Sequence, residues 1–391
     1  MYVIGIDVSK YKHDCIIMHE DTGEIVRDVF SFDNSRAGFV QFISVLKTLN
    51  PTLKKKIGFE TTGHYQDNLK MFLADNGLDF MELNALLVHK FKSSLTLRGV
   101  KTDKTDARLI ANYLCKVEFK PYPKIVYNIL SLRSLCKRHF TLIKDRTKYL
   151  ISITNFLDRT FPELKPFLND NIKSKTAMFL LRKYGIPSKI ANMNIQSYEL
   201  LRKLSRGKFS VAKFYKLKDL AKHTIGFTYP TDTFEIKSLL NVYDSINEEI
   251  LKVETKISTL MSKINSKIPT IKGIGLVSAA TIIAEIEDIN RFVSPDKLLA
   301  YAGLDPRIYE SGTMSSKGKM NKKGSVNLRR VLMNCAESVI MFNPAFYAYY
   351  RKKRDEGKAH RVAISHLARK LVRIIFKLET TQVDFDPSLV K

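Results

Sequence analysis

The sequence predicts an α/β domain at the N-terminus, an α-helical middle that contains a coiled coil, and a mainly α-helical C-terminal domain. Short β-rich runs alternate with helical patterns in the first 120 residues, and longer segments repeat at helical spacing beyond them. We therefore expect an α/β domain over 1–120 and a coiled-coil region over 121–266 with a basic insertion at about 160–235. The C-terminal domain then covers 267–391.

The chain opens with a predicted three-stranded meander. Tyr2–Val8 is a β-rich run that ends in an acidic residue, and Cys15–Met18 and Glu24–Phe30 follow as two further short strands. Asp21–Gly23 supplies turn residues between the second and third strands. Strands joined by such short connections pair antiparallel.

Helices and strands alternate after the meander. Ser35 opens an amphipathic helix, and Lys56–Glu60 reads as a fourth strand. A helix around Leu69–Leu73 and a fifth strand at Leu78–Leu83 come next. Three antiparallel strands, then alternating helix and strand, then a closing helix, is the element order of the ribonuclease H-like fold.

The closing helix is predicted to begin near Asp103 and Asp106. Residues 84–100 show little regular pattern, whereas Leu109 and Tyr113 belong to a helical repeat. A spacing of three places both carboxylates on one helical face, and acidic side chains are favourable at a helix N-terminus. On this stretch alone, Asp103 could be a helix cap and Asp106 a solvated acid of the first turn.

Two further carboxylates complete a set that suits metal ions. Asp7 lies on the first predicted strand and Glu60 at the end of the fourth, while Asp103 and Asp106 open the closing helix. Two Mg²⁺ or Mn²⁺ ions about 3.5–4 Å apart need several hard oxygen ligands to polarise a phosphodiester. Singly, Asp7 could be a strand-end acid and Glu60 a salt-bridge partner. Jointly, the four acids predict a two-metal site.

The charge of the chain is distributed unevenly. The chain has 65 Lys and Arg against 39 Asp and Glu, a net charge of +26, yet residues 1–100 hold 12 basic and 12 acidic side chains. The remainder therefore carries the whole excess. Nucleic acid is the natural partner of such a surface, and an anionic membrane is the weaker alternative. A general excess of lysine would not leave the first hundred residues neutral.

The sequence gives little support for disulfides, cysteine-based zinc sites or histidine-based metal sites. The four cysteines, Cys15, Cys115, Cys136 and Cys335, form no close pairs, which argues against a disulfide framework or a Cys-type zinc site. The eight histidines lack metal-binding spacing. No basic-then-apolar leader and no apolar run of about 18 residues is found, so we expect a cytoplasmic protein that does not enter membranes.

The middle region contains two long helical repeats. Apolar residues recur at helical spacing among many basic residues over 129–157, which predicts a long basic helix. Those of 236–264 step by threes and fours over about four heptads, which predicts a coiled coil. Its partner is either the 129–157 helix of the same chain or the same helix of a second protomer.

The insertion between these helices is harder to interpret. Prolines interrupt it at Pro162, Pro166 and Pro187, and lysines and arginines alternate with aromatic residues such as Phe214 and Tyr215. Basic and aromatic residues together suit a phosphate backbone and unpaired bases. A solvated helical insertion with a small core is the alternative.

Two glycine-containing segments of the C-terminal domain suggest phosphate binding. Around Gly273 and Gly275 the sequence is similar to a helix-hairpin-helix, in which backbone amides approach a phosphate, although a tight turn is the alternative. Further on, Ser311 is expected in a loop, as a nucleophile or as part of a phosphate-binding loop. The cations that flank it are Arg307, Lys317, Lys319, Lys322, Lys323, Arg329 and Arg330.

These motifs together resemble the DEDD transposases of the IS110/IS1111 insertion-sequence family, relatives of the Piv-type DNA invertases. The resemblance covers most of the chain through GIDVSK around Asp7, FETTGHY around Glu60, KTDKTDA around Asp103, GIG at Gly273 and LAYAGLDPR before Ser311. The KGSVNLRR segment closes the match.

The resemblance implies a RuvC-like N-terminal domain, a coiled-coil middle and a C-terminal transposase domain. It also implies a homo-oligomer, dimer or tetramer, that works with a noncoding bridge RNA pairing with donor and target DNA. Asp7, Glu60, Asp103 and Asp106 match the family acids, and Ser311 matches its nucleophilic serine, with Ser315 and Ser316 nearby. The 160–235 insertion is longer and more basic than the family implies.

Three functional hypotheses follow from these features. The leading hypothesis is a site-specific DNA recombinase of an insertion sequence, guided by RNA. The second is a RuvC-like structure-specific nuclease, which needs the four acids but no serine. The third is a non-catalytic nucleic-acid-binding scaffold, against which the complete acid set argues.

Overall fold

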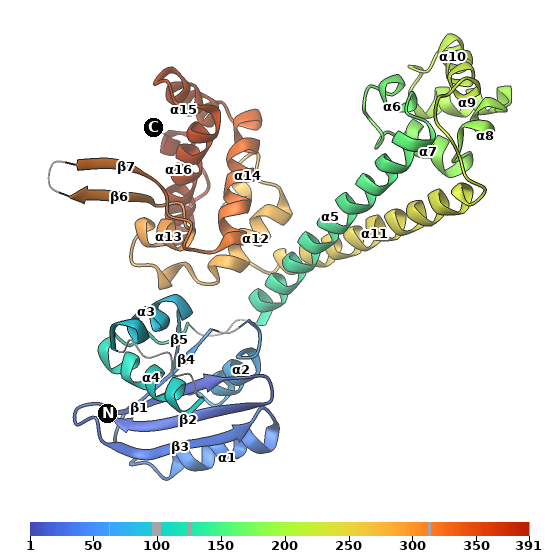
Figure 1. Cartoon of the computed structure of the whole chain (residues 1–391). Coiled ribbons are helices and arrows are strands. Elements are labelled where there is room, and N and C mark those ends of the chain that lie inside the picture. Colours follow the sequence, from blue (N-terminus) through green and yellow to red (C-terminus); the bar gives the residue numbers. More distant parts are fainter. Residues whose placement is uncertain (62, 96–102, 124–126, 312–313, 391) are drawn as a thin grey trace. The chain divides into compact units, whose positions relative to one another are not determined.

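The computed structural model describes residues 1–391 apart from 62, 96–102, 124–126, 312–313 and 391, and the side chains of 95, 103–104, 307–311 and 314–319 are also outside the described part. The chain divides into two compact units, Met1–Tyr127 and Asn128–Lys391. The first is a mixed α/β unit and the second is mostly helical, as the sequence predicts (Figure 1).

The first unit is built on a five-stranded sheet with the order β3-β2-β1-β4-β5. The strands β1, β2 and β3 form the predicted antiparallel meander, and β4 and β5 run parallel to β1. Their bounds are β1 Tyr2–Val8, β2 Lys12–His19, β3 Ile25–Asp33, β4 Lys55–Glu60 and β5 Phe80–Leu83. All five strands were predicted from the sequence.

Helices cover both faces of this sheet. One buried cluster joins Ile4, Ile6 and Phe59 to helices α1 (Arg36–Lys47) and α2 (Asp67–Asp75). The opposite face carries a second cluster that joins the strands to α3 and α4. These helices span α3 Ala85–Leu95 and α4 Asp103–Lys116. Alternate residues of β1 therefore face different helix pairs.

Helix α3 lies where no helix was predicted. Its segment ALLVHKFKSSL buries Val88, but the neighbouring Leu86 and Leu87 are 44% and 48% exposed. Because its apolar residues do not all face the core, the segment lacks the periodic stripe that identifies a helix in a sequence. Ser35, by contrast, caps α1 as predicted, accepting a hydrogen bond from the backbone of Gly38.

Two long helices run through the second unit, α5 (Tyr127–Thr160) and α11 (Asp232–Met261). They lie side by side and antiparallel, because His139 contacts Glu254 while Arg159, near the other end of α5, pairs with Asp232 (Figure 1). The described structure thus pairs α11 with the 129–157 helix of the same chain, one of the two predicted partners.

Five short helices connect the far ends of these long helices. They are α6 (Leu164–Phe167), α7 (Lys175–Lys183), α8 (Pro187–Ala191), α9 (Ile195–Leu204) and α10 (Val211–Lys222). A buried cluster of their own, with Phe161, Leu180 and Phe214 among its members, holds them to the ends of α5 and α11. We call residues 161–231 the tip segment.

The C-terminal elements pack around a third large cluster that also receives the near ends of α5 and α11. They are η1 (Ile268–Thr270), α12 (Leu276–Ile286), η2 (Ile289–Arg291), α13 (Pro295–Tyr301), β6 (Pro306–Ser311), β7 (Met314–Met320), α14 (Val326–Phe342), α15 (Pro344–Asp355), α16 (His360–Thr381) and η3 (Pro387–Val390). Strands β6 and β7 form a hairpin between α13 and α14.

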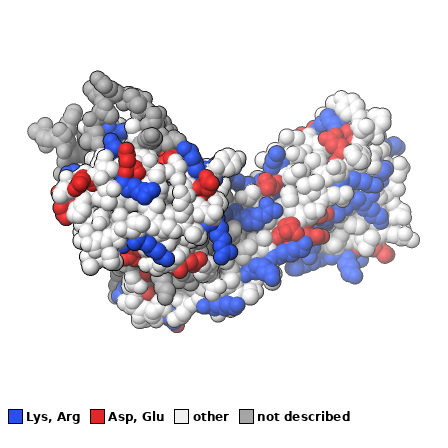
Figure 2. Space-filling view, turned by 90° about the horizontal axis from the view of Figure 1, so that it is seen from below, with Lys and Arg blue, Asp and Glu red and all other residues white. Residues whose placement is uncertain are grey.

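The surface charge follows the sequence. Figure 2 shows Lys and Arg side chains gathered along the right-hand part of the view, over the α5–α11 helices and the tip segment. Among the helices described, none combines the length and the apolarity that a membrane span requires.

Candidate functional site

Two of the predicted acids lie at the ends of neighbouring parallel strands. The register of β1 and β4 pairs Gly5 with Gly58 and Ile6 with Phe59, so Asp7 and Glu60 are the next residues on each strand. Since Ile6 and Phe59 face α1 and α2, alternation directs Asp7 and Glu60 to the opposite face, which α4 covers. The sheet thus places two carboxylates side by side.

Helix α4 approaches this face very closely because two glycines leave room for it. A Cβ atom on Gly5 would lie 2.5 Å from the backbone nitrogen of Ala111 and 2.6 Å from the carbonyl oxygen of Ala107. A Cβ on Gly58 would lie 2.9 Å from the Leu114 side chain. Backbone-to-backbone packing therefore fixes the helix that carries Asp106 against the strand that carries Asp7.

The remaining two acids belong to the first turn of α4. Asp103 is its first residue, although its side chain lies outside the described part. Asp106 is partly buried and accepts a 2.7 Å hydrogen bond from the Nζ atom of Lys92 on α3. Among the side chains that the structure describes, no three potential ligands lie close enough together to hold a metal ion.

Asp14 is an acid of this region that sequence reasoning missed. It lies on β2 directly opposite Asp7 in the antiparallel register and is 5% exposed. Its carboxylate accepts a hydrogen bond from Ser31 and lies 3.5 Å from Lys12 Nζ. Like charges on directly opposed residues are unfavourable, and the ammonium group of Lys12 compensates the charge of Asp14. The available signal in the sequence was an acid, Asp14, directly before the apolar stretch Cys15–Met18.

Ser311 lies at the end of β6 and not in a loop, which corrects the prediction. The β6–β7 register pairs Ser311 with Met314, Glu310 with Ser315 and Tyr309 with Ser316, and only residues 312–313 separate the strands. The abundance of Gly, Ser and Lys suggested a loop, but β-favouring residues such as Ile308 and Tyr309 extend the hairpin. The side chains of Arg307, Ser311, Lys317 and Lys319 lie outside the described part.

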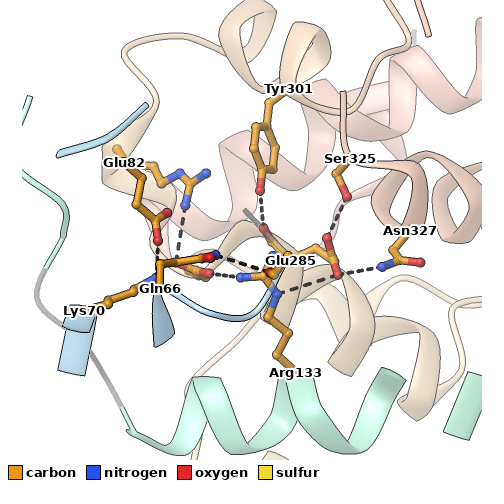
Figure 3. Close-up of polar contacts among 11 residues, drawn as sticks. Gln66, Lys70, Glu82, Arg133, Glu285, Tyr301, Ser325 and Asn327 are labelled. Atoms are coloured by element: carbon orange, nitrogen blue, oxygen red, sulfur yellow. Dashed lines mark hydrogen bonds and ion pairs between the residues drawn. The ribbon is translucent and has the colours of Figure 1, made fainter. Parts of the chain in front are cut away.

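The base of this hairpin is fixed by one buried acid, Glu285 of α12, which is 4% exposed. Its Oε2 atom accepts a 2.6 Å hydrogen bond from Ser325, the residue that caps α14 after the hairpin. Its backbone carbonyl accepts a 3.2 Å hydrogen bond from the hydroxyl of Tyr301, the last residue of α13 before the hairpin. Figure 3 shows Tyr301, Ser325 and Asn327 converging on Glu285. One residue thus holds both ends of the hairpin segment.

Charged neighbours and a backbone bridge reinforce this base. Arg133 of α5 lies 3.9 Å from Glu285 and forms an ion pair with Glu287, which also lies 3.4 Å from Arg291. The backbone nitrogen of Ser325 donates a 2.7 Å hydrogen bond to the carbonyl of Tyr301. Burial raises the pKa of the Tyr301 hydroxyl, which therefore remains a donor.

Family comparisons match both parts of the chain that carry predicted site residues. The model for the IS110 DEDD domain, described as a transposase, matches residues 4–162, and the model described as transposase of the IS116/IS110/IS902 family matches residues 265–351. The chain belongs to the IS110 family of transposases. It is therefore an enzyme of DNA transposition or recombination, as the resemblance implied.

Several relatives match this transposase over nearly their full length. A 42 kDa protein of insertion element IS900 from Mycobacterium paratuberculosis is 24% identical, with 98% of this chain and 97% of the relative covered. A 44.8 kDa protein of IS116 from Streptomyces clavuligerus is 22% identical, with 98% and 96% covered. The pilin gene-inverting protein of Moraxella bovis is 23% identical, with 98% and 97% covered.

The glycines of the GIG segment have two different surroundings in the transposase. Gly273 has a φ of +102°, and a Cβ there would lie 2.7 Å from the Cα atom of Val339, so this glycine allows close packing on α14. Gly275 caps α12 and has open space around it, beside a hollow of about 460 Å³ lined in part by Lys272. The element directly before them is the three-residue η1, and α11 already ends at Met261, so the expected helix-hairpin-helix has no α-helix directly before its hairpin.

The basic residues after the hairpin fall into two groups, exposed lysines and arginines that contact other parts of the fold. Lys322 and Lys323 are exposed, as nucleic-acid binding requires. Arg329 instead donates a 3.1 Å hydrogen bond to the carbonyl of Lys322, and the guanidinium of Arg330 lies 3.6 Å from the centre of the Phe140 ring. Burial lowers the pKa of Arg330. These two arginines are therefore engaged within the fold.

Proposed function

We propose that this transposase is a site-specific DNA recombinase of an insertion sequence, which combines four acids with a nucleophilic serine under the guidance of a noncoding RNA. The observation that carries the proposal is the placement of Asp7 and Glu60 at the ends of adjacent parallel strands. Both face the helix whose first turn contains Asp103 and Asp106. The strand order and closing helix support a ribonuclease H-like, RuvC-like domain.

The acid set fits divalent cations. Carboxylates are the hard oxygen donors that Mg²⁺ and Mn²⁺ prefer, and Asp7, Glu60, Asp103 and Asp106 would hold them. Bound Mg²⁺ would polarise the phosphodiester and lower the pKa of the attacking hydroxyl. Lys92, which is 2.7 Å from Asp106, neutralises one carboxylate of the set and would have to share it with a metal ion. The chain's own contribution is to hold the acids on one face.

Ser311 supplies the step that separates a recombinase from a nuclease. Its Oγ atom attacks the scissile phosphorus after losing its proton, a P–O bond to the serine forms, and the bond to one deoxyribose oxygen breaks. That oxygen leaves with a proton as a hydroxyl group. Because the phosphoserine ester conserves the bond, a hydroxyl of a second strand can reverse the step without another energy source.

The basic second unit supports contacts with donor DNA, target DNA and a bridge RNA. Exposed cations there can neutralise phosphates, whereas the first hundred residues carry no net charge. The acids and the serine lie in different units of the chain, so they must meet for the reaction, within one protomer or between protomers of a dimer or tetramer. The coiled-coil character predicted for α5 and α11 is compatible with either assembly.

A reconstituted exchange assay tests the proposal. Donor DNA, target DNA and RNA transcribed from the flanking element are mixed with protein and Mg²⁺, and joined strands are counted. Asp7→Asn, Glu60→Gln, Asp103→Asn and Asp106→Asn should each reduce joining to background while circular dichroism shows a folded protein. Full joining by any two variants would refute the metal assignment. Broken strands without joined products, from the unmodified protein, would instead indicate a nuclease.

A further inference from the structure

The tip segment carries an excess of positive charge that does not contribute to its folding. Residues 161–231 contain 14 Lys and Arg but only 4 Asp and Glu. The two family models leave residues 163–231 of this stretch unmatched, since one ends at residue 162 and the other begins at 265. Like charges collected on a small body repel one another and lower its stability. A binding partner of opposite charge would explain why the charge is tolerated.

One side of α7 lines a hollow in the surface of the tip segment. The buried face of α7 holds it to the core through residues such as Leu180 and Leu181. The other side lines a hollow of about 470 Å³, whose residues are Lys175, Phe179, Arg182 and Lys183 of α7 and Leu204 at the end of α9. Residues at these spacings share one side of a helix. The hollow therefore has an apolar floor and a cationic rim.

The aromatic floor is held in place by its neighbours. The ring of Phe179 packs edge-on against Tyr184, with centroids 6.5 Å apart. The hydroxyl of Tyr184 forms a hydrogen bond with Ser197 of α9, which ties the aromatic pair to the next helix. A ring that is already positioned loses little entropy when a flat partner stacks on it.

The rim cations differ in their availability. Arg182 forms paired hydrogen bonds with Asp244, the shorter contact being between Nη2 and Oδ1, so its charge is compensated within the fold. Lys183 lies 5.5 Å from the centre of the Phe179 ring, and within the described part of the chain neither it nor Lys175 forms an ion pair. Both ammonium groups can therefore take phosphates beside the aromatic floor.

We propose that this hollow binds an unpaired nucleotide of single-stranded nucleic acid. The base stacks on Phe179, and the phosphates on either side contact Lys175 and Lys183. A paired base would have both faces covered by its neighbours in the duplex, so the site favours single strands. The inference goes beyond the proposed strand exchange and does not depend on it, because it concerns binding alone.

Binding by the full-length protein tests this site. Fluorescence anisotropy is measured with three labelled probes: single-stranded RNA, single-stranded DNA of the same sequence, and the corresponding DNA duplex. Stacking on one aromatic ring contributes about 1–3 kcal/mol per base, so Phe179→Leu should weaken binding of one or both single-stranded probes by about tenfold. Comparison of the RNA and DNA probes identifies the sugar preferred. Binding of the duplex should not change.

Lysine variants give a second measurement that does not alter the core. Lys183→Gln and Lys175→Gln should each weaken single-strand binding and reduce the slope of log K against log salt by about 0.7. Matched controls are Phe234→Leu, which removes a 77% exposed ring outside the hollow, and Lys237→Gln, which removes an exposed lysine of α11. Unchanged binding in Phe179→Leu and Lys183→Gln would overturn the proposal, as would equal losses for duplex and single strands.

Discussion

The two regions that carry the proposed catalytic residues are held in different ways. The acids lie on strands of an open five-stranded sheet and on the helix α4 that packs on it, and buried apolar clusters cover both faces of that sheet. Ser311 lies on a hairpin whose strands, in the described part of the chain, pair only with each other. The positions of the acids therefore depend on packing, whereas the position of the hairpin depends on the polar contacts of Glu285 at its base.

This difference means that the two regions should fail in response to different mutations. A change of volume between β1 and α4 should displace the acids, because tightly packed backbones have no room to adjust. A change of polarity at Glu285 should alter the hairpin and leave the sheet intact.

The largest effect is expected for Gly5→Ala. The added methyl group would lie 2.5 Å from the backbone nitrogen of Ala111, so α4 must move away from β1 and carry Asp103 and Asp106 with it. Strand exchange should fall to background, and overpacking should lower the free energy of unfolding by about 1–3 kcal/mol. Exchange assays and denaturant unfolding measure the two effects.

Gly58→Ala is the matched control on the neighbouring strand. Its methyl group would meet the end of the Leu114 side chain at 2.9 Å, and a flexible side chain can rotate where a backbone cannot. We expect partial activity and a smaller loss of stability. If Gly5→Ala were as active as Gly58→Ala, backbone packing of α4 on β1 would not position the acids.

A smaller effect is expected for Glu285→Gln. The amide still fills the site, but it offers one acceptor in place of two to Ser325 and Asn327, so the α14 end of the hairpin segment is held less firmly. The hydrogen bond from Tyr301 is made to the backbone carbonyl and remains. The exchange rate should fall by about tenfold, as for a small misplacement of reacting groups, while DNA affinity stays the same. Rate and affinity are measured separately on the same substrates.

Glu287→Gln is the appropriate comparison for this variant. Glu287 pairs with the same Arg133, whereas the hydrogen bonds of Tyr301 and Ser325 are made to Glu285. Its replacement should lower stability without slowing exchange once the protein is folded. Equal exchange rates for the two glutamine variants would show that Glu285 has only a structural role.

The order of the elements in the first unit could be predicted because its signals are local. Runs of β-favouring residues predicted β1 and β4, and Ser35 was recognisable as a helix cap. These signals place Asp7 and Glu60 at strand ends without knowledge of the tertiary structure. The family comparisons then agreed with the motifs around them.

The polar features of the molecule could not be predicted in the same way. Glu285, Tyr301 and Ser325 are separated by up to 40 residues, and nothing in the intervening sequence indicates that they meet. The close approach of α4 to Gly5 likewise depends on tertiary packing. The tip segment was hard to interpret because its five short helices bury only a few residues each.

A buried histidine should make the stability of the first unit depend on pH. Burial lowers the pKa of His13 to about 4, and its ring packs against Phe32 and Phe39. In the unfolded chain an imidazole titrates near pH 6.5, so the unfolded state binds the extra proton first as the pH falls. Stability should therefore decrease between about pH 6.5 and pH 4, by on the order of 3 kcal/mol.

Denaturant unfolding across this range measures the effect. A His13→Leu variant has no imidazole to titrate and should lose less stability over the same interval. The acid-bearing unit should respond more strongly than the C-terminal elements, which can be followed by hydrogen exchange. Equal pH dependence in the variant and the unmodified protein would show that other groups determine the acid response.

The role of Ser311 as nucleophile is tested most directly by capture of the serine ester itself. A nicked donor substrate, which lets the cleaved end diffuse away, should leave the protein covalently attached to DNA in the presence of Mg²⁺. Trypsin would release residues 308–317, which contain Ser311, Ser315 and Ser316, and fragmentation of that peptide identifies the modified residue. We predict the adduct on Ser311, and none with Ser311→Ala or Asp7→Asn. An adduct on Ser315 or Ser316, or cleavage at the normal rate by Ser311→Ala, would show that Ser311 is not the nucleophile.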